Sequence, residues 1–139
     1  MPPRVGVIVQ LGLLAWKVLN KLYRIYASLI PPEREALRNH LQALHQVLRD
    51  VAERRNEMPN SLPVLMMPPL ETMDPTQSAR KRSKIRFQER SRQFRQNARR
   101  TARTIREYQS SFTVEDTRDI RARLDEIRKI LFEAERRSR

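Results

Sequence analysis

Hydrophobic residues recur at helical spacing in four stretches of this chain, which predicts an all-α protein. The first stretch, residues 4–30, is apolar around most of its circumference and carries one narrow polar stripe. That stripe consists of Gln10, Lys17, Lys21, Arg24 and Ser28. A helix with this pattern is wetted along one side and buried on the others.

The second and fourth stretches, residues 32–57 and 114–136, each carry a narrow apolar seam. In both, the apolar residues follow steps of four and three, the spacing of a coiled coil. The seam of the second stretch consists of Leu37, Leu41, Leu44, Leu48 and Val51. The seam of the fourth consists of Ile120, Leu124, Ile127, Leu131 and Ala134. We expect Pro31 and Pro32 to begin the second helix and Thr113 to cap the fourth.

The third stretch, residues 79–109, combines a thin apolar stripe with a high positive charge. It holds twelve Lys or Arg and two acids, Glu89 and Glu107. Its stripe consists of Phe87, Phe94, Ala98, Ala102, Ile105 and Tyr108. The stripe favours a helix that docks on protein over a disordered basic tail.

Residues 58–77 contain five prolines among apolar side chains. Neither a helix nor a central strand tolerates that density of proline, so we expect an extended arm that lies along another surface. The chain therefore divides into an N-terminal helical hairpin (1–57), the arm (58–77) and a basic C-terminal hairpin (78–139). Seams this narrow build a small core, which we expect partners to complete. The expected partner-packing residues are Leu44, Leu48, Phe94, Leu124 and Ile127.

The charge is concentrated in the third stretch. The chain has 24 Arg and 5 Lys and a net charge of +13, of which residues 78–109 supply +10. Arginines three and four residues apart repel one another, so an anionic partner is needed to offset them. RNA phosphates, anionic lipid and an acidic protein surface are the three alternatives. We expect phosphate contacts from Arg90, Arg92, Arg95, Arg99, Arg100, Arg103 and Arg106.

Catalytic and metal chemistry find no support in the sequence. The chain has no cysteine and two glycines, which excludes thiolate sites and Gly-rich phosphate loops. His40 and His45 are five residues apart, so they do not share a helix face as a metal pair would. We expect no enzyme activity, no cofactor and no metal.

Two short sequence motifs resemble those of the mitochondrial LYR-motif family of small, basic helical accessory proteins. One is Leu22-Tyr23-Arg24, and the other is Phe94-Arg95 within SRQFRQN on the basic stretch. Proteins of that family serve as assembly factors or accessory subunits and dock an acyl carrier protein. The resemblance implies that Tyr23, Arg24 and Arg95 would contact the carrier protein.

Residues 1–32 carry four basic residues and no acid, which suits an uncleaved mitochondrial import signal. We therefore expect a mitochondrial protein of the matrix or the matrix face of the inner membrane. The predicted function is a non-catalytic subunit or assembly factor of a ribonucleoprotein such as the mitochondrial ribosome. The alternative is a membrane-associated subunit or assembly factor of a respiratory-chain complex, with residues 4–30 in or on the bilayer.

Overall fold

A computed structural model describes the backbone of residues 3–57, 62 and 77–137, and the side chains of residues 11–57, 62 and 88–137. The described chain is helical, with α1 (Pro3–Ile25), α2 (Pro31–Arg54), α3 (Gln77–Tyr108) and α4 (Val114–Arg137). Short 3-10 turns, Tyr26–Ser28 and Gln109–Ser111, follow α1 and α3. The all-α prediction is confirmed, and most helix bounds lie within three residues of those expected.

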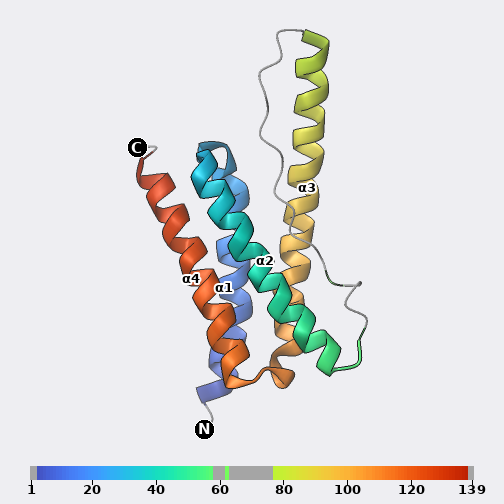
Figure 1. The fold of residues 1–139 in the computed structure, drawn as a ribbon, viewed down its shortest axis with the longest axis vertical. Coiled ribbons are helices and arrows are strands. Elements are labelled where there is room, and N and C mark those ends of the chain that lie inside the picture. The colour runs from blue at the N-terminus through green and yellow to red at the C-terminus, as the bar shows by residue number, and fades with distance from the viewer. Residues whose placement is uncertain (1–2, 58–61, 63–76, 138–139) are drawn as a thin grey trace.

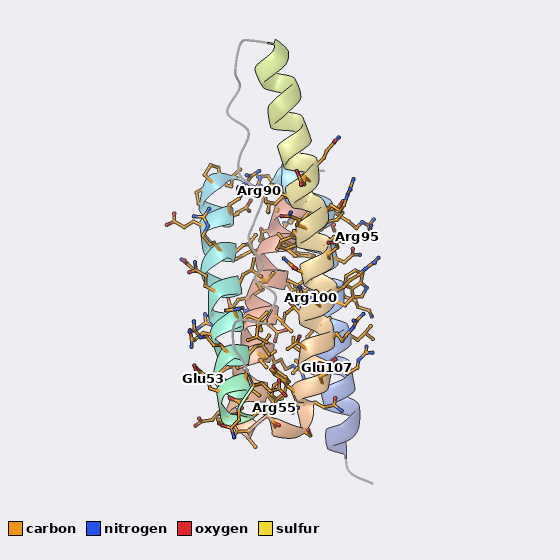
Figure 2. All side chains as sticks on the ribbon, turned by 90° about the vertical axis from the view of Figure 1, so that its right-hand side faces the viewer. Glu53, Arg55, Arg90, Arg95, Arg100 and Glu107 are labelled. Atoms are coloured by element: carbon orange, nitrogen blue, oxygen red, sulfur yellow. The ribbon has the colours of Figure 1, made fainter. Side chains whose placement is uncertain are left out.

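The helices form a bundle in which α1 and α4 run one way and α2 and α3 run the other (Figure 1). The helices of each predicted hairpin are antiparallel, as expected. The main packing, however, joins α1 to α3 and α4, and α2 to α4 and, less extensively, α3. The two helices of each predicted hairpin, α1 with α2 and α3 with α4, thus occupy diagonal corners (Figure 2). The two predicted hairpins therefore combine into one bundle with a common core.

The apolar seams face the axis of this bundle. Every seam residue of α2 and α4 predicted from the sequence is buried. The five residues assigned to packing against a partner, Leu44, Leu48, Phe94, Leu124 and Ile127, lie instead in the chain's own core. The reason is geometric: one apolar stripe from each of four helices encloses a core that two helices cannot.

Helix α1 is buried on two sides because it packs on both α3 and α4. Leu11, Ala15, Val18, Leu19 and Leu22 point into the core. Lys17 and Arg24, from the predicted polar stripe, are exposed. Among the described residues, no helix is long and apolar enough to cross a bilayer.

Arginines close the end of the bundle where α1 turns into α2. Arg34 lies 4.2 Å from the centroid of the Tyr26 ring and donates to the Tyr26 phenol oxygen at 3.0 Å. It also donates to the carbonyl oxygen of Leu29 at 3.3 Å. From the end of α4, Arg137 donates to both carboxylate oxygens of Glu33 at 2.7 and 2.8 Å. These contacts fix the short turn against the last turn of α4.

A capping box begins α4 at the opposite end. The amide of Asp116 donates to Thr113 Oγ1 at 3.0 Å, and the amide of Thr113 donates to Asp116 Oδ2 at 2.9 Å. The predicted cap at Thr113 is confirmed. Asp116 also pairs with Arg54 of α2, so the start of α4 is tied to the end of α2.

Most of the predicted arm lies outside the described residues. Within residues 58–77, Leu62 is buried in the core and Gln77 belongs to α3.

Candidate nucleic-acid interface

Helix α3 separates its apolar and basic residues cleanly over its described part. Six side chains between Phe94 and Tyr108 are buried, and they form the stripe that packs on the bundle. They are Phe94, Ala98, Thr101, Ala102, Ile105 and Tyr108. The Thr101 hydroxyl is satisfied within the helix, because it donates to the carbonyl oxygen of Asn97 at 2.8 Å. The predicted stripe is confirmed from Phe94 onward, while the side chain of Phe87 lies outside the described residues.

All seven arginines predicted to bind phosphate are exposed: Arg90, Arg92, Arg95, Arg99, Arg100, Arg103 and Arg106. Figure 2 shows Arg90, Arg95 and Arg100 following one another along α3. The buried stripe therefore attaches α3 to its own chain and leaves the guanidinium groups facing solvent.

Ion pairing within the chain takes its cations from other elements. Between described residues, the basic partners are Lys21, Arg49, Arg54, Arg55, Arg128, Lys129 and Arg137. The six α3 arginines other than Arg100 form no ion pair with a described residue. Glu107 lies on the same helix and is also exposed. Between described residues, the positive charges of the other six arginines are thus not neutralised by an ion pair.

Two of these arginines lie over aromatic rings of α1. The guanidinium carbon of Arg95 is 5.7 Å from the centroid of the Tyr23 ring. That of Arg99 is 5.5 Å from the Trp16 ring. Both rings are half-buried at the edge of the α1–α3 interface. Sequence reasoning did not assign Trp16 to the site, although its seven-residue spacing from Tyr23 places both rings on one face of a helix.

Arg106 continues this row toward the bundle end where α3 finishes. A Cβ atom placed on Gly12 would lie 3.7 Å from Arg106 Cβ and 3.9 Å from its Nε. The same atom would lie 3.5 Å from the carbonyl oxygen of Ala102. Helix α3 therefore passes over Gly12 at a distance where a methyl group would make ordinary contacts, and the stem of Arg106 packs there.

The other side of α3 borders a shallow cleft shared with the end of α2. Its lining includes Arg100, Arg103, Glu107, Tyr108 and Glu57. Burial and a hydrogen bond to Glu57 raise the pKa of Tyr108 to about 12. Hydrogen bonds from Tyr108 and Arg55 lower the pKa of Glu57. The cleft is thus stabilised by its own ionic network and includes two of the phosphate-binding candidates.

The first turns of α3 extend beyond the ends of the other helices (Figure 1). The sequence of this projecting part is basic, with Arg80, Lys81, Arg82, Lys84 and Arg86. The projecting turns therefore concentrate positive charge at one end of the helix.

The three residues that the LYR-like motifs suggest for carrier-protein contact lie on two helices: Tyr23 and Arg24 on α1, and Arg95 on α3. Tyr23 and Arg95 meet in the ring contact described above. Arg24 is exposed on α1. The structure thus brings two of the three candidates for carrier-protein contact together.

The two histidines of α2 have different surroundings. His40 Nδ1 lies 3.2 Å from a guanidinium nitrogen of Arg123. Burial, and to a lesser extent the charge of Arg49, lowers the pKa of His45. Across the described residues, no group of three or more His, Asp or Glu side chains is arranged to hold a metal ion.

Comparison with known proteins found no match to this chain among protein-family models, curated proteins or solved structures.

Proposed function

We propose that this chain is a non-catalytic, RNA-binding subunit or assembly factor of a larger ribonucleoprotein, such as the mitochondrial ribosome. The observation that carries the proposal is the division of α3. One stripe is buried on the chain's own bundle, and seven arginines are exposed. A rigid rod of guanidinium groups suits the regularly repeating charge of a phosphate backbone.

Phosphate contacts would position the chain without reading sequence. The two aromatic residues of α3 whose side chains the structure describes, Phe94 and Tyr108, support this mode because both are buried. They are therefore not available to stack on an unpaired base. RNA recognition would thus depend on charge and shape rather than on bases.

The packing of α1 supports the membrane-associated alternative less well than it supports the RNA-binding proposal. In that alternative, the apolar side chains of α1 would face lipid. Five of them, Leu11, Ala15, Val18, Leu19 and Leu22, are instead buried in the core that α1 shares with α3 and α4, while Leu13 is exposed. Anionic headgroups could still attract α3, so the experiment below includes vesicles.

Salt dependence of RNA binding tests the proposal. If about five arginines contact phosphate, the logarithm of the association constant should fall linearly with the logarithm of salt concentration. Replacing Arg95, Arg99 and Arg103 by Gln should flatten the slope by about one unit for each lost contact. Circular dichroism should show unchanged helicity.

The matched control removes the same charge from another helix. Arg118, Arg121 and Arg136 of α4 are exposed, and their replacement by Gln should leave the slope nearly unchanged. Equal slopes for both triple variants would assign the binding to net charge alone. Binding of the wild type to anionic vesicles but not to RNA would replace the ribonucleoprotein with a membrane-associated complex.

The contact between Tyr23 and Arg95 favours a second candidate, an accessory protein that docks an acyl carrier protein as LYR-motif proteins do. Arg24→Glu with Arg95→Glu should then abolish capture of acyl carrier protein, while Arg118→Glu with Arg121→Glu should not. The expected mitochondrial location belongs to both candidates, and import of the full chain into isolated mitochondria tests it.

A further inference from the structure

Arg95 and Arg99 differ from their neighbours on α3 because the guanidinium group of each lies over an aromatic ring of α1, 5.7 and 5.5 Å from the ring centroid. We call these two the held arginines. Among the described rings, no such contact exists for Arg90, Arg92, Arg103 or Arg106. The seven arginines predicted from the sequence are therefore not equivalent, although all are exposed.

Contact with a ring changes what an arginine contributes to binding. The ring attracts one face of the guanidinium group through its quadrupole. The N–H donors lie in the plane of the group and point from its edge, so they remain free to bind a phosphate. A side chain that is already ordered loses less conformational freedom when its ligand arrives.

The two held arginines are also placed to act together. Arg95 and Arg99 are four residues apart, so their side chains leave α3 one above the other on the same face. Tyr23 and Trp16 are seven residues apart on α1, which runs antiparallel to α3. The stem of Arg106 over Gly12 extends the same row.

We propose that Arg95 and Arg99 are the principal phosphate-binding pair of this protein and that both bind the backbone of one RNA strand. Arg95 lies over Tyr23 and Arg99 over Trp16. This inference rests on the RNA-binding function proposed above. It goes further by ranking two arginines above the others and by giving Trp16 and Tyr23 the role of positioning residues.

RNA is favoured over an acidic protein by the charge around the pair. Arg92, Arg103 and Arg106 lie near the pair on α3, and Lys17 and Arg24 are exposed on α1. An extended, uniformly charged backbone matches such a surface over several turns of helix, whereas a protein carboxylate occupies one point of it.

Single substitutions compare held and unheld arginines. Arg99→Gln and Arg103→Gln remove the same charge from the same helix, one turn apart. We expect Arg99→Gln and Arg95→Gln to weaken binding of a structured RNA about two- to fivefold more than Arg103→Gln does. All three should flatten the salt slope by no more than about one unit.

Substitution of the ring tests its positioning role. Trp16→Leu keeps an apolar side chain at the interface and should weaken RNA binding about two- to fivefold, with the salt slope unchanged because no phosphate contact is lost. Arg99→Lys serves as a second variant that preserves the interface and the charge. It should also weaken binding, because an ammonium lacks the planar fork.

Trp16 also provides a direct readout, because it is the only tryptophan in the chain. RNA that binds Arg99 should change the fluorescence of Trp16 in the wild type and in Arg103→Gln. The change should be lost in Arg99→Gln even at RNA concentrations that saturate binding.

Two results together would overturn the inference and leave the RNA-binding function intact. The affinity for RNA would fall equally in Arg95→Gln, Arg99→Gln and Arg103→Gln, and bound RNA would not change the fluorescence of Trp16. Wild-type protein that binds polyglutamate but not RNA would overturn both the inference and the RNA-binding function. Loss of affinity confined to the held pair, together with the fluorescence change, would establish the pair as the primary contact.

Discussion

The phenol of Tyr108, the last residue of α3, donates a 2.8 Å hydrogen bond to Oε2 of Glu57, just beyond the end of α2. Asn56 makes this contact possible, because its φ of 57° turns the chain out of α2. The Glu57 amide then donates to the carbonyl oxygen of Ala52 at 2.9 Å, which is the Schellman form of a helix end. Arg55 completes the cluster, 4.8 Å from the centroid of the Tyr108 ring and 3.0 Å from Glu57 Oε1. Figure 2 shows Arg55 at this end of the bundle.

Tyr108→Phe should destabilise the bundle by about 1 kcal/mol, the usual effect of losing one hydrogen bond. The pKa of Tyr108 is raised to about 12 in the folded chain, first by burial and then by Glu57. An unfolded tyrosine ionises near pH 10. The folded state therefore retains a proton that the unfolded state releases, and stability falls as the pH rises from about 10 to about 12.

The variant should lack that part of the alkaline loss, which urea titrations at several pH values would measure. Tyr26 provides the comparison, because burial raises its pKa too and its phenol binds Arg34 rather than a carboxylate. An identical alkaline profile in wild type and Tyr108→Phe would mean that Tyr108 is neither buried nor hydrogen-bonded to Glu57 in solution.

Acid should destabilise the start of α4 through Asp116. Burial opposes ionisation of this carboxyl group, but hydrogen bonds from Arg54 and Thr113 outweigh it and lower its pKa. The unfolded state then binds the proton first, so this contribution is present above the ordinary pKa of Asp and is lost as the pH falls through the lowered value.

Asp116→Ala should remove both the capping contact and the link to α2, at a cost of about 1 kcal/mol at neutral pH. It should also flatten the dependence of the melting temperature on pH below about 5. Asp119→Ala is the matched control, since Asp119 is exposed on the same helix. Equal acid sensitivity of wild type and Asp116→Ala would show that the other carboxylates with a lowered pKa, such as Glu33 and Glu57, carry the effect instead.

The helices and their buried faces were predictable because each is encoded locally. Leu44 and Leu124 follow the coiled-coil spacing, and Thr113 shows the composition of a cap before Glu115 and Asp116. The arrangement of the helices was not predictable. The seams have the same period and similar side chains, so nothing in them indicates that α1 packs on α3 and α4 rather than on α2.

The same limit applies to the candidate site. The exposed arginines follow from the position of the apolar stripe, since residues off the stripe must face solvent. The contacts of Arg95 with Tyr23 and of Arg99 with Trp16 depend on which helix covers that stripe and in which direction it runs. Those facts belong to the packing of the whole bundle and not to any one segment.

A carboxylate in either seam should unfold the bundle. Leu44 and Leu124 have no exposed surface, and an uncompensated buried charge costs several kcal/mol. We expect Leu44→Asp and Leu124→Asp to lose most of their helical circular dichroism and to be excluded from the assembly. Phe132→Asp is the control on α4, because this side chain is 58% exposed. If both variants remain helical and are incorporated normally into the assembly, the seams are not buried in solution.

Gly12→Ala should stabilise the chain by about 0.5–1 kcal/mol, because glycine inside a helix is less favourable than alanine by that amount. The new methyl group has room. Its nearest neighbours would be the carbonyl oxygen of Ala102 at 3.5 Å and Arg106 Cβ at 3.7 Å, which are ordinary contact distances.

A larger side chain should have the opposite effect at the same position. Gly12→Leu places four carbon atoms between α1 and α3, three more than Gly12→Ala does, and should cost about 1–3 kcal/mol through overpacking. Urea unfolding followed by circular dichroism would measure both variants. Stabilisation by Ala and destabilisation by Leu would together locate α3 directly over Gly12. Stabilisation by both would show that this face of α1 is open, because helix propensity alone would then decide the result.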